Sequence, residues 1–123
     1  MSSNSPKKLA NLNKRLVQNY DNTTCNLKFS QCDDNKYQLW NLDKMQLKKF
    51  VNFAKKIENM KWLEIKRTKS YHYESISNLK KPDFISEDIV LKSIRVNEKF
   101  RIYGYRIASD FYIIWFDPNH ELT

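Results

Sequence analysis

Residues 89–116 read IVLKSIRVNEKFRIYGYRIASDFYIIWF, and this stretch decides the fold. It contains three runs of β-branched and aromatic residues, which are typical of strands. The runs cover residues 89–96, 100–107 and 111–116, with only a few residues between them. Because connections this short join antiparallel neighbours, the stretch predicts a three-stranded antiparallel meander. The last run is apolar without a break, which predicts a strand covered on both faces.

A helix is predicted over residues 44–58, upstream of these strands. Asp43 precedes it as an N-cap, and Gln46 is spaced to bond back to that cap, which makes a capping box. Lysines occupy much of the remaining helix surface. The expected buried stripe consists of the apolar residues at helical spacing: Leu47, Phe50, Val51, Ala54 and Ile57.

Three shorter segments complete the prediction. Alternating apolar residues predict a half-buried strand over 25–31, and Trp62, Leu63 and Ile65 predict a short helix over 61–67. Residues 68–83 are rich in polar residues and contain a proline, so we expect this segment to be mostly loop. Helices packed on one small sheet make α+β the expected fold class.

The length of 123 residues corresponds to one domain. Residues 6–19 have the pattern of a basic amphipathic helix. We therefore expect an N-terminal basic helix or arm within residues 1–24 and a single domain over 25–123. The first residues contain no secretion signal, and no apolar run reaches the ~20 residues needed to span a bilayer. A cytoplasmic protein without a membrane partner is the expectation.

Charge is the strongest global signal in the sequence. Twenty-two Lys and Arg residues face fourteen Asp and Glu residues, for a net charge of +8. This balance favours a polyanionic partner such as RNA or the ribosome, although a merely soluble, lysine-rich surface would show the same count. A single glycine excludes phosphate-binding loops and dinucleotide fingerprints.

The cysteines and histidines are few and dispersed. Cys25, Cys32, His72 and His120 could together supply four zinc ligands, but they include no closely spaced pair of the kind zinc sites show. Reduced, buried thiols are the simpler interpretation. We expect no metal ion and no cofactor.

Most of the chain resembles the RelE/ParE-type toxins, a family of ribosome-dependent messenger-RNA nucleases and gyrase inhibitors. The resemblance covers about residues 25–122. It is carried by SIRV at 93–96, FRIY at 100–103, FYIIW at 111–115 and NHEL at 119–122. The segment 101–120 also resembles a group of small uncharacterised bacterial and phage proteins, which adds no activity.

The family resemblance implies a RelE-like fold and a metal-independent, ribosome-associated endoribonuclease of a toxin–antitoxin system, with a cognate antitoxin as partner. RNA cleavage needs a base for the ribose 2′-hydroxyl, cations for the phosphorane charge and an acid for the leaving oxygen. Arg101 matches the family's strand arginine, and His120 lies near its reactive C-terminal position. His72 is the second candidate for proton transfer. Whether the protein is an enzyme stays open at this point.

Further residues are candidates for binding RNA. On the strand 100–107, Arg101, Tyr103 and Tyr105 alternate onto one face, and Gly104 and Arg106 onto the other. A basic face with interleaved tyrosines suits phosphate binding and base stacking. Mid-strand Gly104 indicates a bulge, or a close approach by another backbone or a ligand. The complete candidate set is Lys66, Arg67, Lys69, Tyr71, Arg95, Tyr103, Tyr105 and Arg106.

Each candidate also has a structural interpretation. His120 would complete a turn, His72 would be a surface loop residue, and Arg101 would pair with Glu98 or Asp117. Tyr103 and Tyr105 would pack within the sheet. For the whole chain, the alternative function is a non-catalytic module, such as a mobile-element or phage regulator or inhibitor, that binds protein or nucleic acid. A gyrase-type inhibitor is the third hypothesis.

Overall fold

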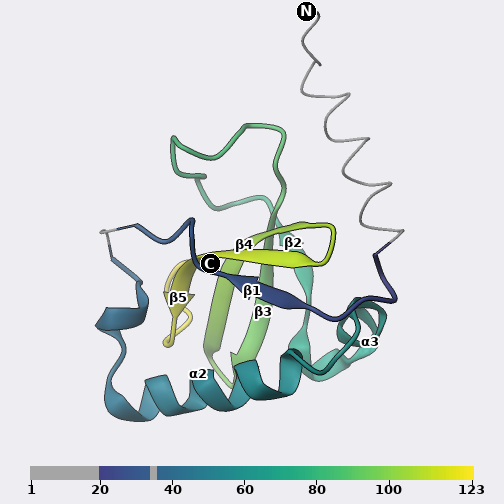
Figure 1. Ribbon diagram of the computed structural model, residues 1–123. Coiled ribbons are helices and arrows are strands. Elements are labelled where there is room, and N and C mark those ends of the chain that lie inside the picture. Colours follow the sequence, from purple (N-terminus) through teal and green to yellow (C-terminus); the bar gives the residue numbers. More distant parts are fainter. Residues whose placement is uncertain (1–19, 34–35) are drawn as a thin grey trace, which may run out of the picture.

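The computed structural model describes residues 20–33 and 36–123, which form one five-stranded sheet with helices packed against it (Figure 1). The predicted helix at 6–19 lies outside the described residues. The strand order is β1-β5-β4-β3-β2; β1 pairs with β5 in parallel, and the other neighbours are antiparallel. The strands are β1 (Asn26–Lys28), β2 (Glu74–Ile76), β3 (Leu91–Asn97), β4 (Phe100–Ile107) and β5 (Asp110–Asp117). The predicted combination of helices and one small sheet is confirmed.

The helices follow the expected positions closely. They are α2 (Lys44–Ile57) and α3 (Trp62–Arg67), with short 3-10 turns η1 (Leu39–Asn41) and η2 (Lys69–Tyr71). The predicted capping box is confirmed: the backbone N–H of Gln46 donates to the carboxylate of Asp43 over 2.8 Å, and the N–H of Asp43 donates to the side chain of Gln46 over 2.9 Å. This reciprocal pair satisfies two backbone donors and fixes where α2 begins.

One detail of the predicted helix was wrong. The buried stripe of α2 includes Phe53, whereas Leu47 and Val51 are 40% and 46% exposed, because the helix is rotated toward its two phenylalanines. Residues 68–83 are mostly loop, as predicted, but they also contain η2 and the strand β2. That strand has only three residues, two of them exposed, so pairing with β3 rather than local alternation creates it.

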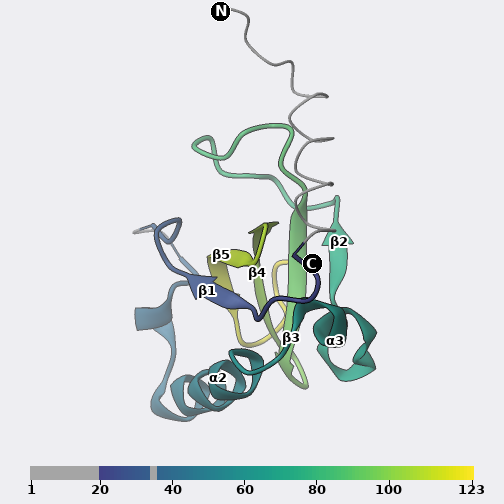
Figure 2. The same ribbon diagram turned by 45° about the vertical axis from the view of Figure 1, so that its right-hand side comes forward.

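Apolar side chains cover both faces of the sheet. On the helix face, α2 and α3 pack on strand residues including Ile94, Ile102 and Phe116. On the opposite face, Ile85 packs on residues including Ile114 and forms a smaller cluster with part of the β2–β3 connection. We call this second side the loop face. The two views show the long β2–β3 connection extending away from α2 (Figures 1 and 2).

A β-bulge divides β4 and β5 at the middle of the sheet. The register shifts between Tyr103 and Gly104, so that Ile114 is an extra residue in β5. A Cβ atom on Gly104 would overlap the carbonyl oxygen of Tyr112, so the predicted bulge with close backbone approach is confirmed. The side-chain amide of buried Gln38 donates to the carbonyl of Ile114 over 3.1 Å and thereby satisfies an oxygen of the bulged residue.

Candidate functional site

Two arginines lie side by side on the loop face of the sheet. Arg95 on β3 is directly opposite Arg101 on β4, a position in which the Cβ atoms of neighbouring strands are about 5 Å apart. Arg101 is 7% exposed, and its Nη1 atom donates to the carbonyl oxygens of Glu98 (2.6 Å) and Phe100 (3.3 Å). Burial, and then the charge of Arg95, lower the pKa of the Arg101 guanidinium.

Neither arginine forms an ion pair with a carboxylate among the described residues. The Nε atom of Arg95 is buried and has no hydrogen-bond partner in the described part of the chain. Asp117 lies opposite Arg101 on β5, but the two form no ion pair; its carboxylate instead accepts the backbone N–H groups of Glu121 (2.9 Å) and Leu122 (2.8 Å). Two adjacent cations without a direct counter-ion are suited to bind an anion.

The segment after β5 brings a histidine to the same side of the sheet. Because Asp117 holds the backbone of this segment, the hydroxyl of Thr123 reaches the hydroxyl of Tyr103 at 2.8 Å. The same Thr123 oxygen lies 3.3 Å from Nε2 of His120, which is exposed. Burial raises the pKa of the Tyr103 hydroxyl. The result is a hydrogen-bonded series from Tyr103 through Thr123 to His120, which we call the hydroxyl relay.

The second candidate histidine lies at the other side of the loop face. Nε2 of His72 is 3.2 Å from a carboxylate oxygen of Glu74, which pairs across strands with Ser93. Glu74 on β2 and Asp117 on β5 are three strand spacings apart, or about 14 Å. The two histidines therefore lie on opposite sides of the arginine pair, and His120 is the one linked to Tyr103.

Arg106 is on the helix face and is used within the fold. Its Nη1 atom donates to Asp21 over 2.9 Å, its Nε donates to the carbonyl of Ala108 over 2.7 Å, and its guanidinium lies 4.2 Å from the ring centre of Trp62. Burial alone would raise the pKa of Asp21, but Arg106 and Lys66 outweigh it and lower that pKa. These contacts account for Arg106 as a structural residue.

The two strand tyrosines are buried in the described conformation. Tyr103 is fully buried and Tyr105 is 8% exposed, and the Tyr105 ring stacks on Tyr112 with 5.1 Å between centroids. Neither ring presents a free face on which a base could stack. This placement agrees with the interpretation that both tyrosines pack within the sheet. The hydroxyl relay links Tyr103 to the exposed side chain of His120.

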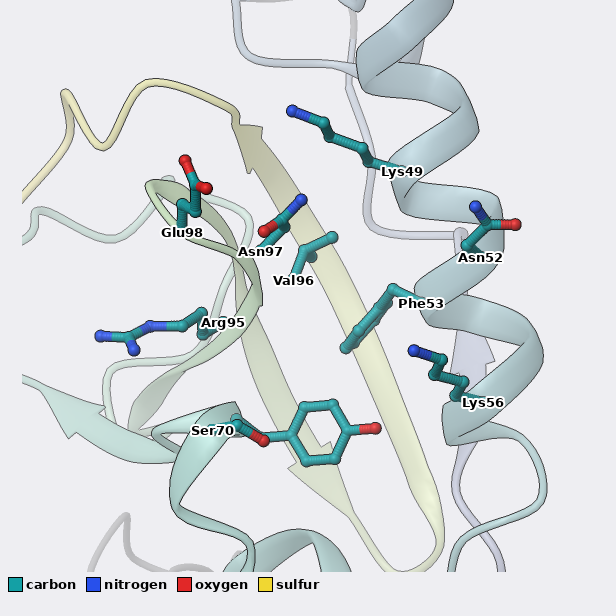
Figure 3. Close-up of a pocket in the computed structure, with 10 residues that line it drawn as sticks. Lys49, Asn52, Phe53, Lys56, Ser70, Arg95, Val96, Asn97 and Glu98 are labelled. Carbon is teal, nitrogen blue, oxygen red and sulfur yellow. The ribbon is translucent and has the colours of Figure 1, made fainter.

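On the helix face of the sheet, a groove of about 580 Å³ lies beside β3, between α2 and η2. Lys49, Asn52 and Lys56 line it from α2, and Arg95 lines it from β3, with its guanidinium directed away from that helix (Figure 3). Tyr71 lines the groove from η2 and packs edge-on against Phe53. Of the remaining RNA-binding candidates, Lys66 is paired with Asp21, and Arg67 and Lys69 are exposed.

Sequence reasoning missed several of these residues. Thr123 gives no signal in the sequence, because its role depends on the path of the chain after β5. Asp117 was expected as a partner of Arg101, but its role in holding the following backbone was missed, although an aspartate before Pro118 and Asn119 is typical of a turn that caps its own backbone. Lys49 and Lys56 were recognised as surface lysines, but only the fold places them beside β3.

Neither a metal cluster nor a membrane span is found in the described part of the chain. No group of three or more His, Cys, Asp or Glu side chains there could hold a metal ion. No described helix is long and apolar enough to cross a bilayer. Both cysteines are free thiols, and burial raises the pKa of Cys25 to about 12 and that of Cys32 to about 11.

Comparison with known proteins gives one structural similarity. No family model and no curated protein matches the chain. Among solved structures, the chain is similar to the archaeal RelE–RelB complex from Pyrococcus horikoshii OT3, with 16% identity and a TM-score of 0.48. The match covers 80% of this chain and 99% of that chain. A similarity at this level supports no argument about activity by itself.

Proposed function

We propose that the chain is a toxin-type RNA-binding protein that cleaves messenger RNA in association with the ribosome, without a metal ion. The observation that carries this proposal is the cross-strand pair Arg95–Arg101, which lacks a direct carboxylate partner in the described residues, beside the hydroxyl relay that ends at His120. The pair supplies positive charge, and the relay supplies an exposed group able to transfer a proton.

The chemistry follows from these groups. A phosphodiester held by Arg95 and Arg101 would place its developing negative charge against two guanidinium groups. His120 would remove the proton of the ribose 2′-hydroxyl, whose oxygen then attacks phosphorus. The bond from phosphorus to the 5′-oxygen breaks, that oxygen takes up a proton, and the products carry a 2′,3′-cyclic phosphate and a 5′-hydroxyl.

The other candidates would contact RNA on either side of the cleaved bond. His72, beside Glu74, is on the β2 side of the arginine pair, opposite the hydroxyl relay, and would contact a neighbouring nucleotide. Four further candidates belong to α3 and η2, next to the part of β3 that does not pair with β2. They are Lys66, Arg67, Lys69 and Tyr71. Together they would give the RNA a path away from the arginine pair.

A cognate antitoxin is part of the proposal. Its basis is the sequence resemblance to RelE/ParE-type toxins, together with the net charge of +8, which favours a partner with acidic segments. Co-expression of such a partner would be expected to relieve growth arrest caused by the chain.

Primer extension on messenger RNA translated by purified ribosomes tests the activity. We expect new 5′ ends with wild-type protein in the presence of EDTA, and at least a roughly tenfold loss with Arg95→Gln or His120→Gln. These exposed or half-buried positions are preferred to Arg101, which is buried and also donates to two backbone carbonyl oxygens. Lys80→Gln, an exposed lysine of the β2–β3 connection, is the charge-matched control. Unchanged cleavage by both test variants would contradict the site.

The non-catalytic binding module is the second candidate. It is favoured by the use of the Arg101 guanidinium in two backbone hydrogen bonds, which leaves fewer of its donors for a substrate. This function predicts RNA retention by wild-type protein, weakened by Arg95→Gln, with intact transcripts throughout. A supercoiling assay separates the gyrase-type alternative from both.

A further inference from the structure

The helix α2 carries five lysines and no acidic residue. All five are exposed, and none forms an ion pair among the described residues. We call this surface the lysine ridge; it consists of Lys44, Lys48, Lys49, Lys55 and Lys56. The arginine pair belongs to the other face of the sheet, although Arg95 also lines the groove that Lys49 and Lys56 border.

The lysines of the ridge form two parallel stripes. Lys48 and Lys55, like Lys49 and Lys56, are seven residues apart, which corresponds to two helical turns and about 10 Å. Lys49 and Lys56 border the groove beside β3, where Figure 3 shows both extending from α2 on the groove side. Asn52 lies between them and adds a neutral hydrogen-bonding side chain.

Helix stability does not explain this distribution of charge. Lys55 and Lys56 in the last turn interact favourably with the helix dipole. Lys44 and Lys48 do not, because they occupy the first turns, where positive charge is unfavourable and where the N-cap Asp43 is followed by no acidic residue within the helix. They also lie four residues apart, a spacing at which like charges destabilise a helix. A polyanionic ligand would compensate all of these charges together.

We propose that the lysine ridge binds the phosphate backbone of a base-paired RNA segment, while the loop face handles a single strand. Closely spaced phosphates on duplex RNA fit two rows of mobile, unpaired ammonium groups, and such binding reads shape and charge rather than sequence. The choice of RNA over DNA rests on the proposed function. The protein would then contact RNA on both sides of its sheet.

Binding to a short 2′-O-methyl RNA hairpin tests this inference without interference from cleavage, because that RNA has no free 2′-hydroxyl to attack its own backbone. The test variant is Lys48→Gln/Lys55→Gln. The control is Lys28→Gln/Lys80→Gln, which removes the same charge from exposed lysines on β1 and on the β2–β3 connection. Affinity is measured by fluorescence anisotropy from 50 to 300 mM salt.

We expect the ridge variant to bind about tenfold more weakly and its salt slope to fall by about two units, since each phosphate contact contributes about 0.9. The control should remain near wild type. Equal losses in the two variants, or tighter binding of duplex DNA of the same sequence, would overturn the inference. Hairpin binding by a protein that cleaves no RNA would support the ridge and contradict only the proposed nuclease activity.

Discussion

Arg101 and Arg106 belong to the same strand but differ in how their charge is compensated. Arg106, on the helix face, has a carboxylate, a carbonyl and an indole ring as neighbours. Arg101, on the loop face, has carbonyl partners for one nitrogen and a second arginine opposite. Both are less than 10% exposed. Burial therefore does not separate a structural arginine from a candidate functional one, whereas the presence of a counter-ion does.

Replacing Gly104 with alanine should give the largest effect, because it disrupts the pairing of β5 with β4, the strand that carries both arginines. The added Cβ would overlap the backbone of Tyr112, and neither strand can move away without losing pairing. We expect a loss of about 3 kcal/mol or more in the free energy of unfolding, measured by urea denaturation. Ser109→Ala, in the β4–β5 turn, is the control. Near-normal stability of Gly104→Ala would show that the strands can separate there.

The difference between Arg101 and Arg106 is tested by replacing each of them with methionine. Arg106→Met should cost about 2 kcal/mol of stability, since it leaves Asp21 with Lys66 as its remaining partner. Arg101→Met should cost about 1 kcal/mol, because it removes hydrogen bonds but leaves no unpaired carboxylate. Phosphate-dependent stabilisation in a thermal melt should be lost only in Arg101→Met. The opposite order of stabilities would refute our assignment of the two roles.

The smallest expected effect has the opposite sign. Arg95→Met removes one of two like charges at directly opposite strand positions and eliminates a buried, unpartnered Nε. We expect the free protein to gain about 0.5 kcal/mol, visible as a higher Tm, while binding of RNA weakens. Lys92→Met, on the same strand but on the helix side, should not show this combination. A destabilised Arg95→Met protein would mean that the arginine pair is compensated in a way the described contacts do not show.

Local signals were enough to predict α2 and the division of β4 into two faces. The capping box determines where α2 begins, and strict alternation assigns Arg101, Tyr103 and Tyr105 to one face. Gly104 is a local signal for the bulge, because no other residue type fits beside the backbone of Tyr112.

The remaining features depend on contacts between distant segments. The strand β2 exists because β3 pairs with it, and the parallel position of β1 beside β5 depends on how the whole chain crosses the sheet. The identity of the neutralised arginine depends on Asp21, which is 85 residues away in sequence. Thr123 joined the candidate site only because Asp117 folds the following residues back toward Tyr103.

The extra residue Ile114 changes which residues of β5 face the helices. Before Ile114, the odd-numbered residues Phe111 and Ile113 face the helices; after it, the even-numbered Phe116 does. If β5 alternated strictly through Ile114, Phe116 would point away from α2, and Asp117 would be carried into the helix-side core. Deleting Ile114 would instead remove the bulge and leave both residues on their present faces, because Trp115 would then follow Ile113 directly in the register with β4. With Ile114 present, the bulge therefore determines the face of the sheet from which the segment carrying His120 begins.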